Sequence, residues 1–269
     1  MTFMDRVRRG WEASGSMLCV GLDPEPSRLP ERWRGDSGAV GIFCRAIVDA
    51  TADLVCAFKP QIAYFSAIGA EEQLIGLCAH IRSVAPHALL ILDAKRGDIG
   101  STAERYAVEA FERYDADAVT VNPYLGVDSI EPFLAWPDRG VFALCRTSNP
   151  GGADLQGLLV DGEPLFTRVA RMIVDRCNDA EQCGLVVGAT YPEELGVVRA
   201  LAPGVPLLVP GVGAQGGDPA AIMQVGRDAS GRGLLVNSSR AVLYASSGAD
   251  FDQSARRVAA ETAAALRIR

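Results

Sequence analysis

The sequence predicts an α/β fold in which eight parallel strands and their helices close into a (β/α)8 TIM barrel. Short apolar, β-branched runs recur along the chain, and a longer stretch with helical spacing or turn residues follows each of them. Eight such units occur in 269 residues, a length that fits two small domains or one large barrel. Because no linker or low-complexity tract divides the chain, we expect residues 1–269 to form one barrel domain with an extra N-terminal helix.

The apolar runs are the strand candidates. We expect strands at residues 17–23, 54–60, 88–95, 118–123, 140–147, 184–190, 206–210 and 233–238. Before the first of them, Met4, Val7 and Trp11 fall on one stripe, which predicts a helix that closes the bottom of the barrel.

The segments between the strands carry helix and loop signals. After the third strand, one face of the expected helix carries small and aromatic residues, namely Ala103, Tyr106, Ala107, Ala110, Phe111 and Tyr114. Asp218 and Pro219 predict an N-cap and a first-turn proline for the seventh helix. Residues 148–164, rich in glycine and proline, are too long for an ordinary connection and predict an active-site loop.

Composition and charge exclude several classes of function. With 33 acidic and 26 basic residues the net charge is −7, opposite in sign to what a phosphate backbone attracts, so we expect no nucleic-acid partner. No apolar run reaches the ~20 residues that span a bilayer, and the N-terminus lacks a signal-peptide pattern, so we expect no membrane association and a cytoplasmic location. Seven cysteines without a CxxC pair indicate neither a disulfide framework nor a zinc site.

Lysine is used at only two positions. Of the 26 basic residues, 24 are arginine, and the exceptions are Lys59 and Lys95. Lysine can release a proton near neutral pH and arginine cannot, so these are candidate site residues unless they remain by chance. Because side chains alternate along a strand, Asp23, Lys59 and Lys95 are predicted to face the barrel interior at the C-terminal strand ends, where barrel active sites form.

The third strand ends in a run with two carboxylates close to one lysine, Asp93, Lys95 and Asp98. Asp93 and Lys95 can point to the same side, and Asp98 follows a glycine that lets the chain turn. A lysine between carboxylates stays protonated, which suits an electrostatic stabiliser and proton donor better than a Schiff-base nucleophile. The alternative interpretation is an ion-pair cluster that fills the mouth of the barrel.

The last two strands lead into a second candidate site. The segment 210–219 is a glycine-rich loop that runs into a helix, and Arg240 follows the next strand. Backbone N–H groups on such a loop, beside an arginine, predict a phosphate-binding site, which barrels often place after strands seven and eight. The alternative is a simple tight turn.

The run Asp93-x-Lys95-x-x-Asp98-Ile-Gly-x-Thr102 resembles the signature of the orotidine 5′-phosphate decarboxylase family at the end of the third strand. Similarity extends through Gly21-Leu-Asp23, Phe58-Lys59-Pro-Gln, Val121-Asn-Pro-Tyr, Ser148-Asn-Pro-Gly, Pro210-Gly-Val-Gly-Ala-Gln-Gly-Gly and Asn237-Ser-Ser-Arg240. The chain is most similar to the family's longer bacterial subgroup, type 2. Gly100, where proline is commoner, and the long 148–164 loop depart from the shorter relatives.

The resemblance implies conversion of orotidine 5′-monophosphate to uridine 5′-monophosphate and CO2 in pyrimidine synthesis, without a metal or an organic cofactor. Lys95 would protonate the ring carbon that loses CO2, and Asp93 would lie beside the departing carboxylate. Lys59 and Asp23 would bind ribose hydroxyls.

The remaining implied contacts involve the base, the phosphate and a second subunit. Ser148 would contact the pyrimidine, and Gln215 and Arg240 would hold the phosphate. The resemblance also implies a homodimer with shared active sites, in which Asp98 and Thr102 reach the ribose in the neighbouring subunit's site.

Two other functions are compatible with parts of the pattern. A sugar-phosphate lyase on a similar barrel shares the Asp-x-Lys-x-x-Asp run but needs a divalent metal. A non-catalytic nucleotide-binding barrel would bind uridine monophosphate and release no CO2, and the presence of both Lys59 and Lys95 argues against it.

Overall fold

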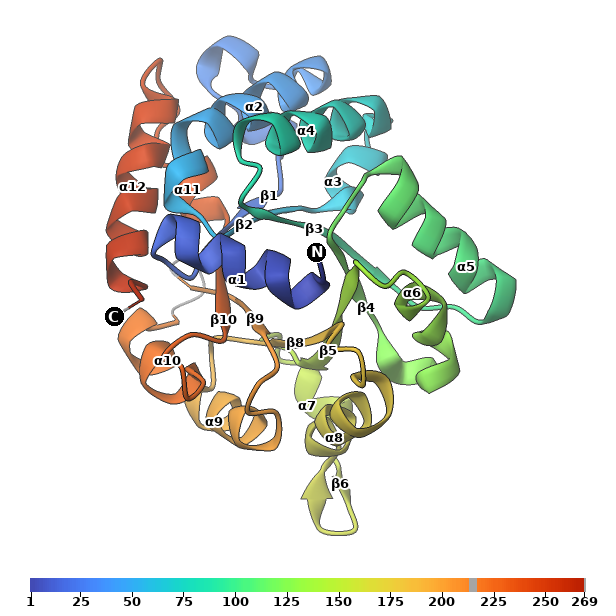
Figure 1. Ribbon diagram of the computed structural model, residues 1–269. Coiled ribbons are helices and arrows are strands. Elements are labelled where there is room, and N and C mark those ends of the chain that lie inside the picture. The colour runs from blue at the N-terminus through green and yellow to red at the C-terminus, as the bar shows by residue number, and fades with distance from the viewer. Residues whose placement is uncertain (213–216, 269) are drawn as a thin grey trace.

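Eight parallel strands close into a barrel in the computed structural model, which describes residues 1–212 and 217–268 (Figure 1). The strands, in their order around the barrel, are β1 (Leu18–Leu22), β2 (Ala57–Pro60), β3 (Leu89–Arg96), β4 (Ala118–Val121), β5 (Gly140–Arg146), β8 (Cys183–Val187), β9 (Leu207–Pro210) and β10 (Leu234–Ser238). β10 pairs with β1 and closes the ring. The predicted TIM-barrel fold is confirmed, and the strand bounds differ from the expected ones by at most three residues.

Helices alternate with the strands and surround the barrel (Figure 1). They are α2 (Val40–Thr51), α3 (Ile62–Ser66), α4 (Glu71–Val84), α5 (Gly100–Val108), α6 (Glu131–Leu134), α7 (Gly152–Leu155), α8 (Leu165–Cys177), α9 (Pro192–Leu201), α10 (Pro219–Gly226), α11 (Arg240–Leu243) and α12 (Phe251–Ala265). The predicted cap of α10 is confirmed, since the Asp218 carboxylate accepts a hydrogen bond from the Ala220 amide at 2.9 Å.

The N-terminal helix α1 (Phe3–Ser14) lies across one end of the barrel (Figure 1). The indole nitrogen of Trp11 donates to the carbonyl of Leu234, the first residue of β10, at 2.8 Å. The Phe3 ring lies edge-on to Phe142 of β5, with ring centroids 5.9 Å apart. As predicted, this helix closes the bottom with one buried face, formed by Phe3, Met4, Val7, Gly10 and Trp11.

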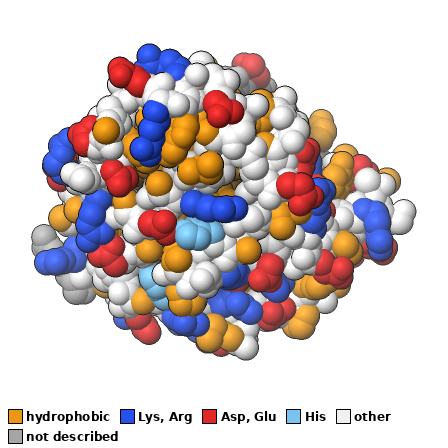
Figure 2. Space-filling view, turned by 90° about the horizontal axis from the view of Figure 1, so that it is seen from above, with side chains coloured by type: hydrophobic (Ala, Val, Ile, Leu, Met, Phe, Trp, Pro, Cys, Tyr) orange, Lys and Arg blue, Asp and Glu red, His pale blue; other side chains and the backbone are white. Residues whose placement is uncertain are grey.

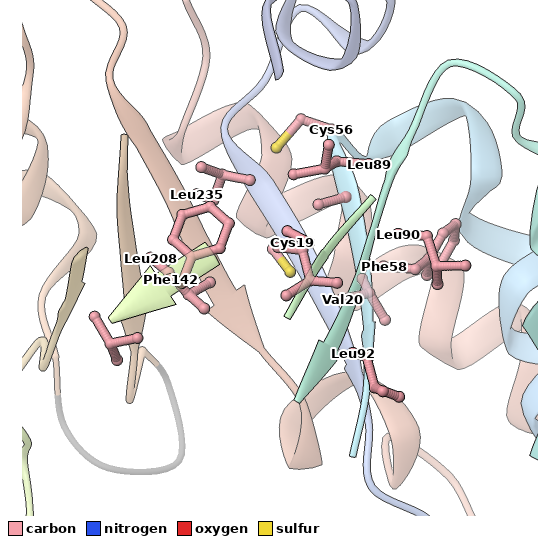
Figure 3. Packing of buried hydrophobic residues seen from close by; sticks show 14 of the residues in the cluster. Cys19, Val20, Cys56, Phe58, Leu89, Leu90, Leu92, Phe142, Leu208 and Leu235 are labelled. Carbon is pink, nitrogen blue, oxygen red and sulfur yellow. The ribbon is translucent and has the colours of Figure 1, made fainter. Parts of the chain in front are cut away.

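The barrel interior is filled by side chains that alternate along the strands. In Figure 3, Cys19, Phe142 and Leu235 lie together on the inner side of the strands. Phe58 and Leu90 point to the opposite side of their own strands, toward the helices. All of these side chains are fully or almost fully buried. The lower barrel is therefore a packed core, and polar side chains can gather only at the opposite, C-terminal ends of the strands.

Two connections contain structure that the sequence did not predict. The 148–164 segment includes α7 and a two-stranded hairpin, β6 (Leu159–Val160) with β7 (Glu163–Pro164), which projects from the barrel (Figure 1). α5 continues into a π-helical turn over Glu109–Arg113. The predicted apolar face of this segment is nevertheless buried at Ala103, Ala107, Ala110, Phe111 and Tyr114, and partly buried at Tyr106.

The outer surface carries charges of both signs. On the side of the molecule in Figure 2, acidic and basic side chains are interspersed with hydrophobic ones. Within residues 1–212 and 217–268, no helix is long and apolar enough to cross a membrane. All seven cysteines are buried and free, as small hydrophobic side chains in the core.

Arg199 of α9 is a buried arginine whose hydrogen bonds go to backbone carbonyls. Its guanidinium donates to the carbonyl oxygens of Gly226, Ala202, Val205 and Gly233 at 2.7–2.8 Å. Burial lowers the pKa of Arg199 to about 10, against the opposing effect of Asp228. One side chain therefore ties the ends of α9 and α10 to the start of β10.

We expect Arg199→Met to lower the free energy of unfolding by about 3 kcal/mol, because the buried carbonyls lose their donors. Urea denaturation measures the change. Arg232→Met is the matched control, since Arg232 makes a partly exposed ion pair with Glu12 at 2.9 Å and should contribute less than about 1 kcal/mol. Equal losses in the two variants would contradict the role assigned to Arg199.

Candidate active site

A cavity of about 260 Å³ opens at the C-terminal ends of the strands. Side chains and backbone from the ends of β1, β2, β3, β9 and β10 line it, including Asp23, Lys59, Gln61, Tyr64, Asp93, Lys95, Gly211, Asn237, Ser239 and Arg240. The structure thus brings together both lysines and the second candidate site that the sequence placed after the last two strands.

Asp93 lies between the two lysines. Its Oδ2 is 2.6 Å from Lys59 Nζ, and its Oδ1 is 2.7 Å from Lys95 Nζ. The side chains of Lys59 and Asp93 are 5% and 8% exposed, whereas that of Lys95 is 46% exposed. Lys95 therefore presents its ammonium group to the cavity, and the buried Asp93 carboxylate, itself paired with Lys59, holds this group in place.

The charges of this cluster stabilise one another. Burial disfavours the ionised carboxylate of Asp93, but Lys59 and Lys95 outweigh burial and hold its pKa well below the usual range. Burial also disfavours the ammonium of Lys59, and the carboxylates of Asp93 and Asp23 reverse this and raise its pKa. Lys59 and Asp93 are therefore ionised at neutral pH.

Asp23 follows β1 and lies beside this cluster. Its Oδ2 accepts a hydrogen bond from Ser239 Oγ at 2.7 Å, and Tyr244 donates to its backbone carbonyl at 3.0 Å. The other carboxylate oxygen, Oδ1, is buried and has no hydrogen-bond partner in the described part of the chain. Buried acceptors without a partner are uncommon in native structures, and a ligand hydroxyl bound beside Asp23 would supply one.

Close contact between β1 and β10 requires a glycine. A Cβ at Gly21 would lie 2.9 Å from Asn237 Oδ1 and 2.9 Å from Ser239 Cβ, and neither can be displaced without disturbing the site. Gly21, two positions before Asp23, thus lets the end of β10 approach the cavity.

The predicted phosphate site lies at the same cavity. Gly211 and Val212, at the start of the glycine-rich loop, line it together with Arg240, the first residue of α11. Arg240 is exposed and makes no ion pair with the residues that the structure describes. Gln215, the other predicted phosphate ligand, lies outside the described residues.

Three predicted site residues do not line the cavity. Asp98 Oδ1 accepts a hydrogen bond from the Ile99 amide at 2.8 Å, and within the described chain Asp98 makes no ion pair with Lys95. Thr102 is exposed on α5. Ser148 follows β5 and packs against Gly188, where a Cβ would lie 2.8 Å from Ser148 Cβ. Among the described residues, Asp93 is thus the one predicted carboxylate that pairs with Lys95.

Sequence reasoning assigned no role to five side chains that line or support the site, namely Gln61, Tyr64, Thr120, Asn237 and Ser239. Thr120 of β4 donates to Asp93 Oδ1 at 2.8 Å, and Asn237 and Ser239 border Gly21 and Asp23. A signal for Thr120 existed, because it is the one polar residue in the run Ala118–Val121, two positions after the inward-facing Ala118. In residues 1–212 and 217–268, no group of three His, Cys, Asp or Glu side chains is placed to hold a metal ion.

Comparison with known proteins identifies the family of this chain. A protein of Azoarcus sp. (strain BH72) named orotidine 5′-phosphate decarboxylase is 60% identical, over 99% of this chain and 98% of its own. The structure of Leishmania donovani OMP decarboxylase is 36% identical with a TM-score of 0.85, covering 99% of both chains. That of Leishmania donovani UMP synthase is 39% identical with a TM-score of 0.87, and this chain covers 57% of it. Residues 16–253 match the orotidine 5′-phosphate decarboxylase / HUMPS family, to which the chain therefore belongs.

Proposed function

We propose that the protein is a carbon–carbon lyase of pyrimidine (UMP) biosynthesis, which converts orotidine 5′-monophosphate to uridine 5′-monophosphate and CO2. The family membership and the 60% identical relative of that name support this function. The observation that carries it is the half-exposed Lys95 ammonium, held 2.7 Å from the buried Asp93 carboxylate at the floor of the cavity.

Loss of CO2 breaks a carbon–carbon bond and leaves its electron pair on a ring carbon. This vinyl-type carbanion has no neighbouring π-system to accept the pair, so a fixed positive charge must stabilise it. Lys95 Nζ supplies that charge and then transfers a proton to the same carbon, which forms the C–H bond of the product. Lys95 regains its proton from solvent before the next turnover.

Asp93 and Lys59 prepare this step. Asp93 lies beside the departing carboxylate and pairs with both lysines, which fixes the direction of the Lys95 ammonium. Lys59 and Asp23 bind ribose hydroxyls, for which the unpartnered Asp23 Oδ1 is a suitable acceptor.

The base, the phosphate and the second subunit complete the proposed complex. Ser148 contacts the pyrimidine, and Gln215 and Arg240 hold the phosphate. Asp98 and Thr102 serve the site of a second copy in a homodimer. Both lie outside this chain's own cavity, Asp98 in the loop before α5 and Thr102 in its first turn, next to Ile99, which is 57% exposed; this position supports that assignment.

We also propose that residues 1–269 form one domain and that the enzyme acts in the cytoplasm on a small nucleotide, without nucleic-acid or membrane partners. The net charge of −7 supports the exclusion of nucleic acid. The reaction is proposed to require neither a metal nor an organic cofactor, because Lys95 supplies both the charge and the proton.

A decarboxylation assay on orotidine monophosphate with a chelator present tests the function. We expect CO2 and uridine monophosphate at the same rate with and without the chelator. Activity that disappears with the chelator would favour a metal-dependent lyase. Binding of uridine monophosphate without CO2 release would favour a non-catalytic nucleotide-binding barrel.

Arg240→Ala tests the phosphate site. We expect kcat/KM for the nucleotide to fall about 10- to 100-fold, since a hydrogen bond to a charged group contributes about 1.5–3 kcal/mol. The nucleoside that lacks phosphate should be affected less than about twofold. Arg168→Ala is the control, because Arg168 pairs with Asp161 on the projecting hairpin. Equal losses on both substrates would place the phosphate elsewhere.

A further inference from the structure

Thr120 of β4 connects two residues of the proposed site without lining the cavity itself. Its side chain is buried, with the residue 1% exposed. The hydroxyl oxygen lies 2.8 Å from Asp93 Oδ1, and 3.0 and 2.9 Å from the amide nitrogens of Ala94 and Lys95. One hydroxyl thus contacts the carboxylate of Asp93 and the backbone of Lys95.

This hydroxyl lies at a β-bulge in the pairing of β3 with β4. The pairing of β3 with β4 shifts between Leu92 and Arg96, so that residues 93–95 lie opposite Thr120 alone. Within this bulge Lys95 has a φ of 47°, in the left-handed region that residues with a Cβ rarely adopt. Such a backbone conformation persists only where surrounding contacts hold it, and the two hydrogen bonds to Thr120 Oγ1 are such contacts.

The directions of the three hydrogen bonds follow from the chemistry of the groups. A threonine hydroxyl has one proton and two lone pairs. The amides of Ala94 and Lys95 can only donate, so they use both lone pairs. The hydroxyl proton therefore points to Asp93 Oδ1, the same oxygen that accepts from Lys95 Nζ.

We propose that Thr120 is a positioning residue for the decarboxylation, which sets the place of Lys95 Nζ through the Lys95 backbone and the Asp93 carboxylate. This inference rests on the proposed function. The Lys95 side chain is long and 46% exposed, and in the described chain its only ion pair is with Asp93. Its backbone and its ion-pair partner are the two points that determine where Nζ lies, and Thr120 holds both. A displacement of about 1 Å at a reacting group can cost about 100-fold in rate.

The wild type and three variants at position 120 form two matched pairs, and the members of each pair differ in the hydroxyl group. Thr120→Val removes the hydroxyl and keeps the branched shape of the wild type. Thr120→Ala removes it relative to Thr120→Ser, and neither of these carries the methyl group. In each pair we expect kcat to fall on the order of 10- to 100-fold when the hydroxyl is lost. The serine variant should stay within about threefold of wild type. KM and the Kd of uridine monophosphate should change less than about threefold throughout, because the groups proposed to bind substrate remain.

Thermal unfolding of all four proteins distinguishes positioning from a structural role. A merely structural role would make kcat follow stability, so the serine and alanine variants would lose activity together. Equal kcat in those two variants, or a loss of product affinity as large as the loss of kcat, would overturn the inference. If Thr120→Val does not fold, the serine and alanine pair alone decides.

The same assay separates this inference from the function on which it rests. A wild-type chain that releases no CO2 from orotidine monophosphate would overturn the proposed function and, with it, the role of Thr120. An active wild type with an equally active Thr120→Val variant would overturn the role of Thr120 alone.

Discussion

Replacing Lys95 with arginine is expected to lower kcat by at least about 10³-fold, although the positive charge is kept. A guanidinium is planar and bulkier than an ammonium group, and it hardly releases a proton near neutral pH. It can still form an ion pair with Asp93, 2.7 Å from Lys95 Nζ in the wild type, so the site keeps its charge balance. The carbanion would then lack both a matched charge and a proton donor.

Steady-state decarboxylation and calorimetric binding of uridine monophosphate together test this result. We expect Lys95→Arg to bind the product with nearly wild-type affinity, because the residues proposed to bind the ribose and the phosphate are unchanged. Arg105→Lys is the reciprocal exchange at an exposed position of α5 and should keep turnover within about twofold. Near-normal turnover of Lys95→Arg would show that the proton-donor assignment is wrong.

The barrel and its lysines could be predicted because each depends on a local pattern. Every strand is an apolar run, and the strands that carry site residues continue directly into polar side chains. Alternation along β3 placed Asp93 and Lys95 on one side, and their 2.7 Å contact confirms it. Lys59 could be linked to them because parallel strands of a barrel end at one face.

The irregular parts of the site could not be predicted in the same way. Period-two alternation contains no signal for the bulge at residues 93–95, so neither the φ of 47° at Lys95 nor the bonds to Thr120 could be expected. Spacing alone also brought Asp98 near Lys95. The glycine before it allowed a turn outward, and in the described residues Asp98 lies outside this chain's cavity, where its carboxylate accepts a hydrogen bond from the Ile99 amide.

Gly100 illustrates how one residue changes the local backbone. Proline, which the resemblance to the family implies is commoner at this position, would fix φ at about −65°. Gly100 has a φ of 53°, which proline cannot adopt. The backbone at the start of α5, whose first turn carries Thr102, therefore has a conformation that a proline at position 100 would not allow.

The helix and hairpin within the 148–164 connection could not be predicted, for a different reason. Its hairpin pairs only Leu159 with Pro164 and Val160 with Glu163, too few residues for an alternation pattern. Ion pairs from α8, between Arg168 and Asp161 and between Arg171 and Glu163, support it instead. Such tertiary contacts leave no periodic trace in the sequence.

The second large effect concerns sharing of the active site between two subunits. Lys95 opens into this chain's cavity, whereas Asp98 and Thr102 lie outside it. The loops after β3 and β4 touch, since a Cβ at Gly97 would lie 3.3 Å from Asn122 Cβ. This edge also exposes apolar side chains, with Ile99, Tyr124 and Leu125 exposed by 57%, 74% and 48%. We propose that a second copy of the chain covers this edge and that Asp98 then serves the neighbouring cavity.

Mixing Lys95→Ala with Asp98→Ala under conditions that exchange subunits tests this arrangement. Each variant alone should be inactive. Random pairing of equal amounts makes half of the dimers mixed, and in a shared arrangement each mixed dimer has one doubly damaged site and one intact site. The mixture should therefore recover about a quarter of the wild-type sites. If both residues instead serve the cavity of their own chain, every site stays damaged and exchange recovers nothing. No gain after exchange has been verified, for example by tagged subunits, would rule out the shared site and leave the role of Lys95 unaffected.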